Sequence, residues 1–227
     1  MRKTILTILA CVAAMLCQAQ ENPAYRIFTS DGEKTDYGTM LKALSKADVI
    51  FIGETHNCPI SHWIEYEVIS DMARKHPKGL VIGAEMLESD NQLLVDEYVS
   101  GVISSDRFES EAKLWDNHYT DYAPLLYLAR DKGFRFIATN VPRRYASFVK
   151  DNGLDALSGL SDAAKALMAP LPVAYDESTA ENEMFSFMNM MGGHGQQNHY
   201  AEAQALKDAT MAWFIAQNLD GKFIHVN

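Results

Sequence analysis

Residues 48–56 read "DVIFIGETH", an apolar run of strand length that leads directly into a glutamate and a histidine. The run is almost continuous in valine, isoleucine and phenylalanine, which is typical of a strand that is covered on both faces. Three further runs share this character: 80–86 ("LVIGAEM"), 134–140 ("FRFIATN") and 222–227 ("KFIHVN"). The four runs therefore predict the strands of one buried sheet, with polar groups at the carboxyl ends.

Helical patterns separate these runs. Residues 59–76 begin with a proline, which suits the first turn of a helix, and residues 121–132 carry apolar side chains at helical spacing before Gly133. Alternation of strand and helix predicts parallel strands joined by right-handed crossovers. Residues from about 150 to 200 carry helical patterns without a strand. The predicted fold class is α/β: a mostly parallel central sheet flanked by helices, with a helical insertion or lid before the last strand.

Composition limits the kind of protein and its partners. The chain has 227 residues, of which 48% are hydrophobic, which suits one domain with a sizeable core. The formal net charge of −10 argues against nucleic acid as a partner, because phosphate binding needs a basic face.

The first residues have the pattern of an export signal. Residues 1–19 combine a basic start, an apolar run too short to span a bilayer, and a small-residue cleavage site ending at Ala19. The mature part, residues 20–227, is then expected to be a single domain without a transmembrane helix, located in the periplasm or cell envelope. Lipid attachment through Cys17 is the alternative, which the bulky Leu16 before it disfavours.

The other end of the sequence also carries an expectation. The chain stops at Asn227, directly after an apolar run, with no covering helix or polar tail. We therefore expect the natural chain to be longer at its C-terminus, and a longer reading frame would test this.

Polar side chains converge where the predicted strands end. Ligands of open parallel sheets bind at the carboxyl ends of the strands. The residues at or near those ends are Glu54, His56, Glu85, Asn140, Arg143, Arg144 and His225.

This set is compatible with several chemistries. Carboxylates with histidines suit a divalent metal that activates water for hydrolysis, whereas arginine and helix N-termini suit an acidic ligand such as the propionates of haem. Structural roles are the alternative: Glu54 could cap the next helix, His56 could be an ordinary loop histidine, and the arginines could be solvated.

Five motifs, in order, carry a resemblance to a known family: "VIFIGETHN", "LVIGAEMLESDNQ", "LWDNHYTDYAPLLYLAR", "FRFIATNVPRR" and "KDATMA". From about residue 44 onward the chain resembles the ChaN-like haem-binding uptake family, within the Tiki / erythromycin-esterase-like superfamily. The resemblance implies an exported haem-binding protein, often a lipoprotein, that serves iron uptake without catalysis. It also implies haem held by tyrosine and histidine at a contact in a homodimer, with outer-membrane uptake components as partners.

The wider superfamily includes hydrolases and metal-dependent proteases, which supply the alternative function. The resemblance places their catalytic and metal-binding residues at Glu54, His56 and Glu85, and Arg143 would hold an anionic substrate. The late histidine of these enzymes is not matched, because His225 lies within the last strand and the expected Gly-x-x-His would fall beyond Asn227. A third possibility is an exported partner-binding protein whose strand-end charges pair with one another.

A haem site needs an apolar slot, an axial ligand and positive charge for the propionates. The leading axial candidates are His199 and Tyr200 at the start of a predicted helix over residues 196–219, followed by His194 and Tyr175. Arg143 and Arg144 are the candidate partners of the propionates.

Other aromatic and histidine residues receive structural predictions. The methionines of residues 184–191 are predicted to lie on a helix that faces the protein core, or alternatively on a lid. Trp115, His118, Tyr119 and Tyr122 are predicted to be packing and pocket wall, and His62 and His76 to be solvated positions on a helix.

Overall fold

The computed structural model describes residues 23–175 and 199–227 of the chain. The chain divides into two compact units, one ending at Met40 and the other comprising Leu41–Asn227. The candidate site residues lie in the second unit, apart from His194, which is outside the described residues.

The first unit contains a short antiparallel hairpin. Its strands are β1 (Ile27–Phe28) and β2 (Lys34–Thr35), and Gly32 adopts a positive φ of 80° in the turn between them. Helix α2 (Tyr37–Leu44) follows the hairpin and crosses the boundary between the units.

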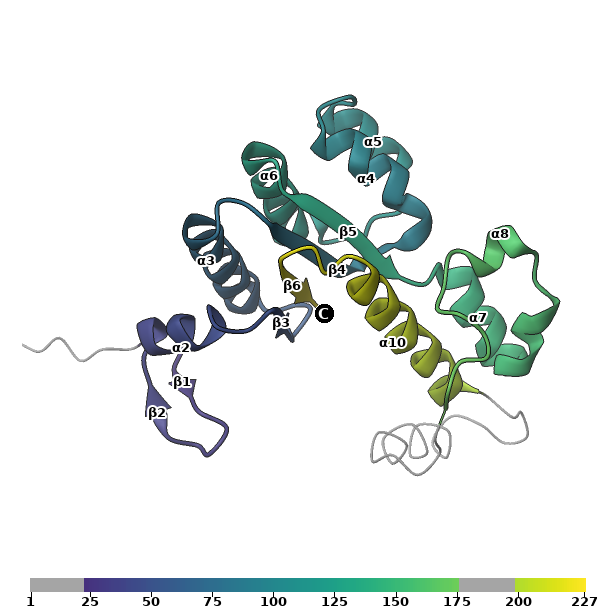
Figure 1. The fold of residues 1–227 in the computed structure, drawn as a ribbon, viewed down its shortest axis with the longest axis horizontal. Coiled ribbons are helices and arrows are strands. Elements are labelled where there is room, and N and C mark those ends of the chain that lie inside the picture. Colours follow the sequence, from purple (N-terminus) through teal and green to yellow (C-terminus); the bar gives the residue numbers. More distant parts are fainter. Residues whose placement is uncertain (1–22, 176–198) are drawn as a thin grey trace, which may run out of the picture. The chain divides into compact units, whose positions relative to one another are not determined.

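The second unit is built on a four-stranded sheet with the order β3-β6-β4-β5, in which every neighbouring pair is parallel (Figure 1). The strands are β3 (Val49–Ile52), β4 (Leu80–Glu88), β5 (Arg135–Asn140) and β6 (Lys222–Val226). The predicted α/β class and all four predicted strands are confirmed. The last strand of the chain lies in the middle of the sheet, between β3 and β4, which is why its residues are so apolar.

Helices connect and cover these strands. In the described part of this unit, the α-helices are α3 (Pro59–Lys75), α4 (Gln92–Val99), α5 (Ser105–Glu111), α6 (Ala123–Lys132), α7 (Arg143–Asn152), α8 (Asp162–Lys165) and α10 (Tyr200–Gln217). Three short non-α turns join them: η1 (Ser89–Asn91), the π-helical η2 (His118–Tyr122) and η3 (Leu154–Gly159). Helices α4 and α10 both pack on β5, and α3 packs on α6.

One apolar cluster of the core surrounds β6. Phe223 is fully buried and packs with Val81, Ile137 and Ile215, the last of which comes from α10. A Cβ on Gly83 would lie only 2.7 Å from the Phe223 ring, so the strand beside this phenylalanine needs a glycine. Glycine at this position lets the ring approach the backbone of β4 closely.

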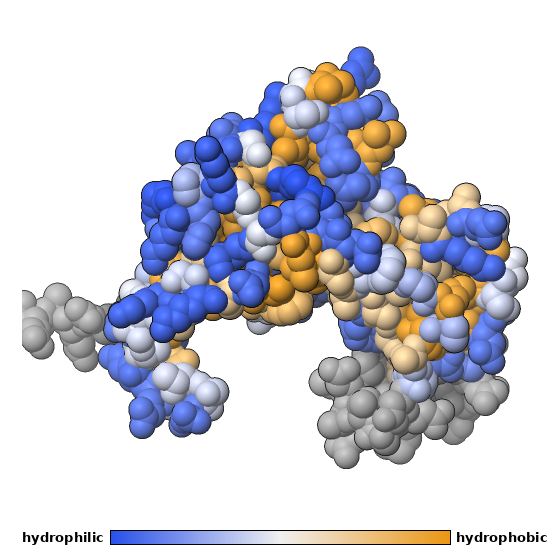
Figure 2. Space-filling model, in the orientation of Figure 1, coloured by the Kyte–Doolittle hydropathy of each residue, from blue (hydrophilic) through white to orange (hydrophobic). Residues whose placement is uncertain are grey.

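The predicted helical insertion consists, in its described part, of α7, η3 and α8. It packs against α10 through a separate apolar cluster that includes Val149, Leu157, Met168 and Leu206. Apolar side chains also gather on the surface over α7 and α8 (Figure 2). The insertion is therefore anchored to the sheet domain by α10.

Among residues 23–175 and 199–227, no helix combines the length and the apolar character that crossing a membrane requires.

Candidate functional site

Glu54 lies at the centre of the strand-end site. It follows β3, and its backbone N–H donates to the carbonyl of Asn227, which follows β6, at 2.8 Å. Its side chain is fully buried. One carboxyl oxygen, Oε1, accepts a hydrogen bond from the hydroxyl of Tyr122 at 2.6 Å and lies 2.7 Å from Nδ1 of His56. Glu54 is thus fixed by the ends of two strands and by a tyrosine from a distant part of the chain.

The π-helix η2 brings that tyrosine into the site. The side-chain amide of Asn117, just before η2, donates to the His56 carbonyl at 3.0 Å and to Asp121 at 2.8 Å. Burial raises the pKa of Tyr122 far above its ordinary value, and its hydrogen bond to Glu54 raises it further. Tyr122 therefore stays protonated and donates to Glu54. The sequence-based prediction gave Tyr122 only a role in packing and missed this one.

Two residues of α3 complete the cluster. Nδ1 of His62 lies 3.1 Å from Oε2 of Glu54 and 3.4 Å from Oε2 of Glu65. Both side chains are buried, at 5% and 1% exposure. The prediction that His62 is a solvated helix position is therefore wrong: α3 turns this face toward the strand ends. The i, i+3 spacing of His62 and Glu65 is the signal that could have identified the pair.

Burial and charge shift the proton affinities of this pair. Burial raises the pKa of Glu65 to about 8, assisted by the neighbouring Glu54. Burial alone would lower the pKa of His62, but its hydrogen bond to the His56 carbonyl and the charges of Glu54, Glu65 and Asp121 raise it overall. A buried carboxyl next to another carboxylate holds its proton more strongly, because two adjacent negative charges repel.

His56 is more exposed than the buried Glu54, His62 and Glu65. Its side chain is 47% exposed, and its ring meets the Trp115 ring edge-on at 5.0 Å between centroids. Trp115 also lines a cavity of about 350 Å³ together with Asn57 and Arg143. Arg143 thus lies at this edge of the molecule. Arg144 instead pairs with Asp90.

Asn140 ends β5, whereas Glu85 lies within β4, which continues to Glu88. Burial raises the pKa of Glu85. The Asn140 amide donates to the Glu85 carbonyl at 3.0 Å, and His225 lies within β6, as predicted, with Nε2 2.8 Å from Thr139 Oγ1. Within the described residues, the carboxylate–histidine group compact enough for one ion is Glu54, His62 and Glu65, not the predicted Glu54, His56 and Glu85.

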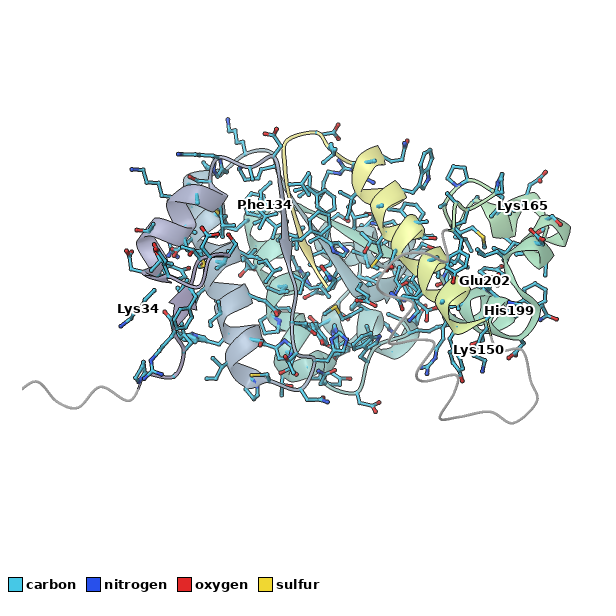
Figure 3. The ribbon with its side chains drawn as sticks, turned by 90° about the horizontal axis from the view of Figure 1, so that it is seen from below. Lys34, Phe134, Lys150, Lys165, His199 and Glu202 are labelled. Carbon is cyan, nitrogen blue, oxygen red and sulfur yellow. The ribbon has the colours of Figure 1, made fainter. Side chains whose placement is uncertain are left out.

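A second candidate site surrounds His199, which immediately precedes α10 (Figure 3). Its Nδ1 lies 2.5 Å from Oε1 of Glu202, whose other oxygen accepts the backbone N–H of Leu154 at 2.7 Å. The His199 N–H donates to the Lys150 carbonyl at 3.0 Å. Its ring lies against Gly153, where a Cβ would come within 3.3 Å of Cε1. The histidine is therefore positioned from both α7 and α10.

A cavity of about 440 Å³ lies in the insertion. Leu154, which bonds Glu202, lines it. The remaining lining residues are Asp155, Ser158, Lys165, Pro170, Leu171, Pro172 and Val173. The lining combines leucine, valine and proline side chains with Ser158 and with one charge of each sign, from Lys165 and Asp155. Lys165 and Glu202 were both absent from the sequence-based site.

The other predicted haem residues lie in or beside this region. Tyr200 begins α10, is 39% exposed and has the Lys150 ammonium 5.6 Å from its ring centroid. Tyr175 is half-buried and follows the cavity wall by two residues. His194 lies outside the described residues.

Replacing Tyr122 by phenylalanine is expected to lower the free energy of unfolding by about 1–3 kcal/mol, because the buried oxygen Oε1 of Glu54 loses the tyrosine hydroxyl and keeps only His56 as a partner. The matched control is Tyr119→Phe, whose side chain is 62% exposed and whose expected effect is below about 0.5 kcal/mol. Urea unfolding of both variants measures the difference. Equal stabilities of the two variants would contradict the bond to Glu54.

The comparison with known families gives a match over most of the chain. Residues 40–227 match the family described as haem-binding uptake, Tiki superfamily, ChaN. The match covers the sheet, the strand-end cluster and the region around His199.

Two individual relatives show the range of similarity. A solved structure described as cofacial heme binding to ChaN of Campylobacter jejuni has a TM-score of 0.66 and 18% identity, covering 92% of this chain and 81% of that one. The chloroplastic protein RETICULATA-RELATED 5 of Arabidopsis thaliana is 23% identical over 133 residues, which is 56% of this chain and 18% of the plant protein. The chain therefore spans less than a fifth of that plant relative. The Campylobacter structure shows that the fold is shared.

Proposed function

The chain belongs to the ChaN family of haem-binding uptake proteins in the Tiki superfamily, and from this premise we propose that it binds haem through His199. The observation that carries the proposal is the bond between His199 Nδ1 and Glu202. The proposed role is haem or iron uptake by an exported protein.

The Glu202 carboxylate gives His199 the arrangement of a metal ligand. A carboxylate oxygen accepts, so Nδ1 carries the hydrogen and Nε2 keeps its lone pair. Histidine ligands usually donate their other ring N–H to a carboxylate or carbonyl, which orients the ring and increases its basicity. Glu202 is itself held by the Leu154 N–H. His199 is thus prepared to give Nε2 to iron, and a haem iron would supply the binding of small axial ligands or electron transfer.

The surroundings suit the rest of a haem. The cavity of about 440 Å³ falls within the range of ligand pockets, and its leucine, valine and proline side chains suit a flat apolar ring. Lys165, in the cavity wall with Asp155, and Lys150, whose ammonium lies 3.5 Å from the exposed Asp151, are the proposed sources of positive charge for propionates. These lysines replace the predicted Arg144, which Asp90 already neutralises.

A second copy of the chain is the proposed source of the remaining contacts. The Campylobacter relative is described as binding haem cofacially. By analogy, a haem whose one face is bound by His199 would present its other face to a haem on a second copy, with Tyr200 near the contact. The leader-like residues 1–19 support export to the periplasm or cell envelope, with lipid attachment at Cys17 as the alternative. Outer-membrane uptake components would then be the partners.

A haemin titration of the purified protein tests the proposal. We expect a saturable Soret shift with a micromolar or lower Kd, about −8 kcal/mol or better, and a doubling of the mass in light scattering when haem is added. A linear, unsaturable absorbance change would overturn haem binding. Saturable binding by a protein that stays monomeric would overturn only the cofacial arrangement.

A further inference from the structure

Three groups that can accept hydrogen bonds or bind a cation converge at one point near His56. The point is surrounded by Nδ1 of His62, Oε2 of Glu54 and the carboxyl group of Glu65. Oε2 of Glu54 and Oε1 of Glu65 are buried and accept no hydrogen bond from any described residue. Buried polar atoms are rarely left in this state without a bound ion or water.

The hydrogen-bond partners of His62 determine which of its ring nitrogens faces the two glutamates. Its Nε2 lies 3.1 Å from the carbonyl oxygen of His56 and 3.4 Å from a carboxylate oxygen of Asp121. Both oxygens accept, so Nε2 carries a hydrogen, and whenever the ring is neutral it directs the lone pair of Nδ1 at the two glutamates. Either a proton or a metal cation must occupy the space between the three groups.

The spacing matches a metal ion. The chosen donor atoms of Glu54, His62 and Glu65 all lie within 4.8 Å of one another, with Nδ1 at 3.1 and 3.4 Å from the two carboxylates. Ligands about 2.1 Å from a transition metal are about 3.0–3.4 Å apart along the edges of its coordination shell. The carbonyl of His56 and the carboxylate of Asp121 then act as the outer partners that orient a histidine ligand.

A route for an ion is also present. His62 and Asp121 both line an open cavity of about 680 Å³, together with Trp63 and Tyr66. Asp121 is 16% exposed there, so a negative charge faces a cation that approaches.

We infer that Glu54, His62 and Glu65 form a binding site for one divalent first-row transition-metal ion, with Zn²⁺ and Mn²⁺ as the test ions. Two carboxylates and an imidazole suit such ions, whereas the nitrogen ligand disfavours Mg²⁺ and Ca²⁺. The site is separate from the region around His199. It differs from the set of Glu54, His56 and Glu85 in taking two of its three ligands from α3.

The test is isothermal titration calorimetry of the chelator-treated full chain with ZnCl₂ and MnCl₂. We expect one equivalent to bind with micromolar or lower Kd, together with proton release, because the ion displaces the proton that the cluster otherwise holds. Glu65→Gln keeps the shape of the side chain but removes the anionic ligand, and it should weaken binding at least about 100-fold. The matched control is Glu67→Gln, the same change two residues further along α3, which should stay within about threefold of the original affinity.

Two further measurements separate this site from its alternatives. His56→Ala and Glu85→Gln should each change the affinity less than about tenfold, and visible absorption of bound Co²⁺ should lose its histidine-dependent bands in His62→Gln. No stoichiometric binding by the unaltered chain would overturn the inference. So would binding that survives Glu65→Gln but is lost in His56→Ala or Glu85→Gln. Haem titration of Glu65→Gln is expected to match that of the unaltered chain. The metal-site inference and the haem-binding proposal can therefore be overturned independently.

Discussion

Replacing His199 by alanine is expected to weaken haem binding by at least about 100-fold and to remove the Soret shift of the bound state. Losing an outer partner of a metal ligand costs about 10–100-fold in affinity, so losing the ligand itself should cost more. Glu202→Gln tests the hydrogen-bond partner of the proposed ligand, because an amide in place of the carboxylate no longer polarises the His199 ring in the same way. Its expected effect is about 10-fold or more.

Two controls identify the ligand. His76→Ala changes a histidine that ends α3, away from the insertion, and should leave the haem affinity unchanged. Tyr200→Phe keeps the ring but removes the hydroxyl, and it should also preserve the Soret band. If Tyr200→Phe loses the band and His199→Ala keeps it, the tyrosine is the axial ligand and the proposed role of Glu202 is wrong.

Lowering the pH from about 6.5 to 4 is expected to remove up to about 6 kcal/mol of stability through His118 and His225 together. Burial lowers the pKa of each from the ordinary 6.5 to about 4. Each imidazole therefore takes up its proton at pH 6.5 when unfolded but only near pH 4 when folded. At 1.36 kcal/mol per pKa unit each contributes about 3 kcal/mol, which is fully present above pH 6.5 and is lost as the pH falls through this window. A loss of this size is comparable with the whole stability of many domains.

The geometry explains why both rings stay neutral. His225 is 1% exposed, and the Thr139 hydroxyl beside its Nε2 already donates to the Ala84 carbonyl, so its oxygen accepts from Nε2–H. His118, the first residue of η2, is 3% exposed and packs near the Phe108 ring, 6.2 Å between centroids. An added charge on either ring would be poorly solvated.

The measurement compares urea unfolding at pH 7 and pH 4.5 for the unaltered chain and for His118→Gln/His225→Gln. The double variant should lose less stability between the two pH values, even if it is less stable at pH 7. The comparison between variants is needed because Glu65 and His62, whose pKa values are raised, titrate with the opposite sign. Equal pH dependence in both proteins would show that the two histidines are protonated in the folded state.

The sequence by itself determined the fold class and the location of the strand-end site around Glu54. Runs such as "DVIFIG" and "LVIGAEM" are apolar without alternation, which is typical of buried parallel strands. The first of them nevertheless forms the edge strand β3, which leaves Phe51 63% exposed. The carboxyl ends of these strands carry Glu54, His56 and Glu85, so the strand pattern alone assigns all three to one edge of the sheet. Local rules suffice here, because strand periodicity and the parallel connection are properties of short segments.

The tertiary structure decided which side chains share the cluster. Which face of α3 turns toward Glu54 depends on how that helix packs on α6 and on the strand order β3-β6-β4-β5. Neither is encoded in a short window, so His62 and Glu65 were missed and His62 was predicted to be solvated. Tyr122 reaches Glu54 across 68 residues of chain through a π-helical turn. Glu202 likewise meets Leu154 across 48 residues. Spacing along the sequence shows which groups an element carries, but contacts between distant elements arise only when their apolar faces pack together.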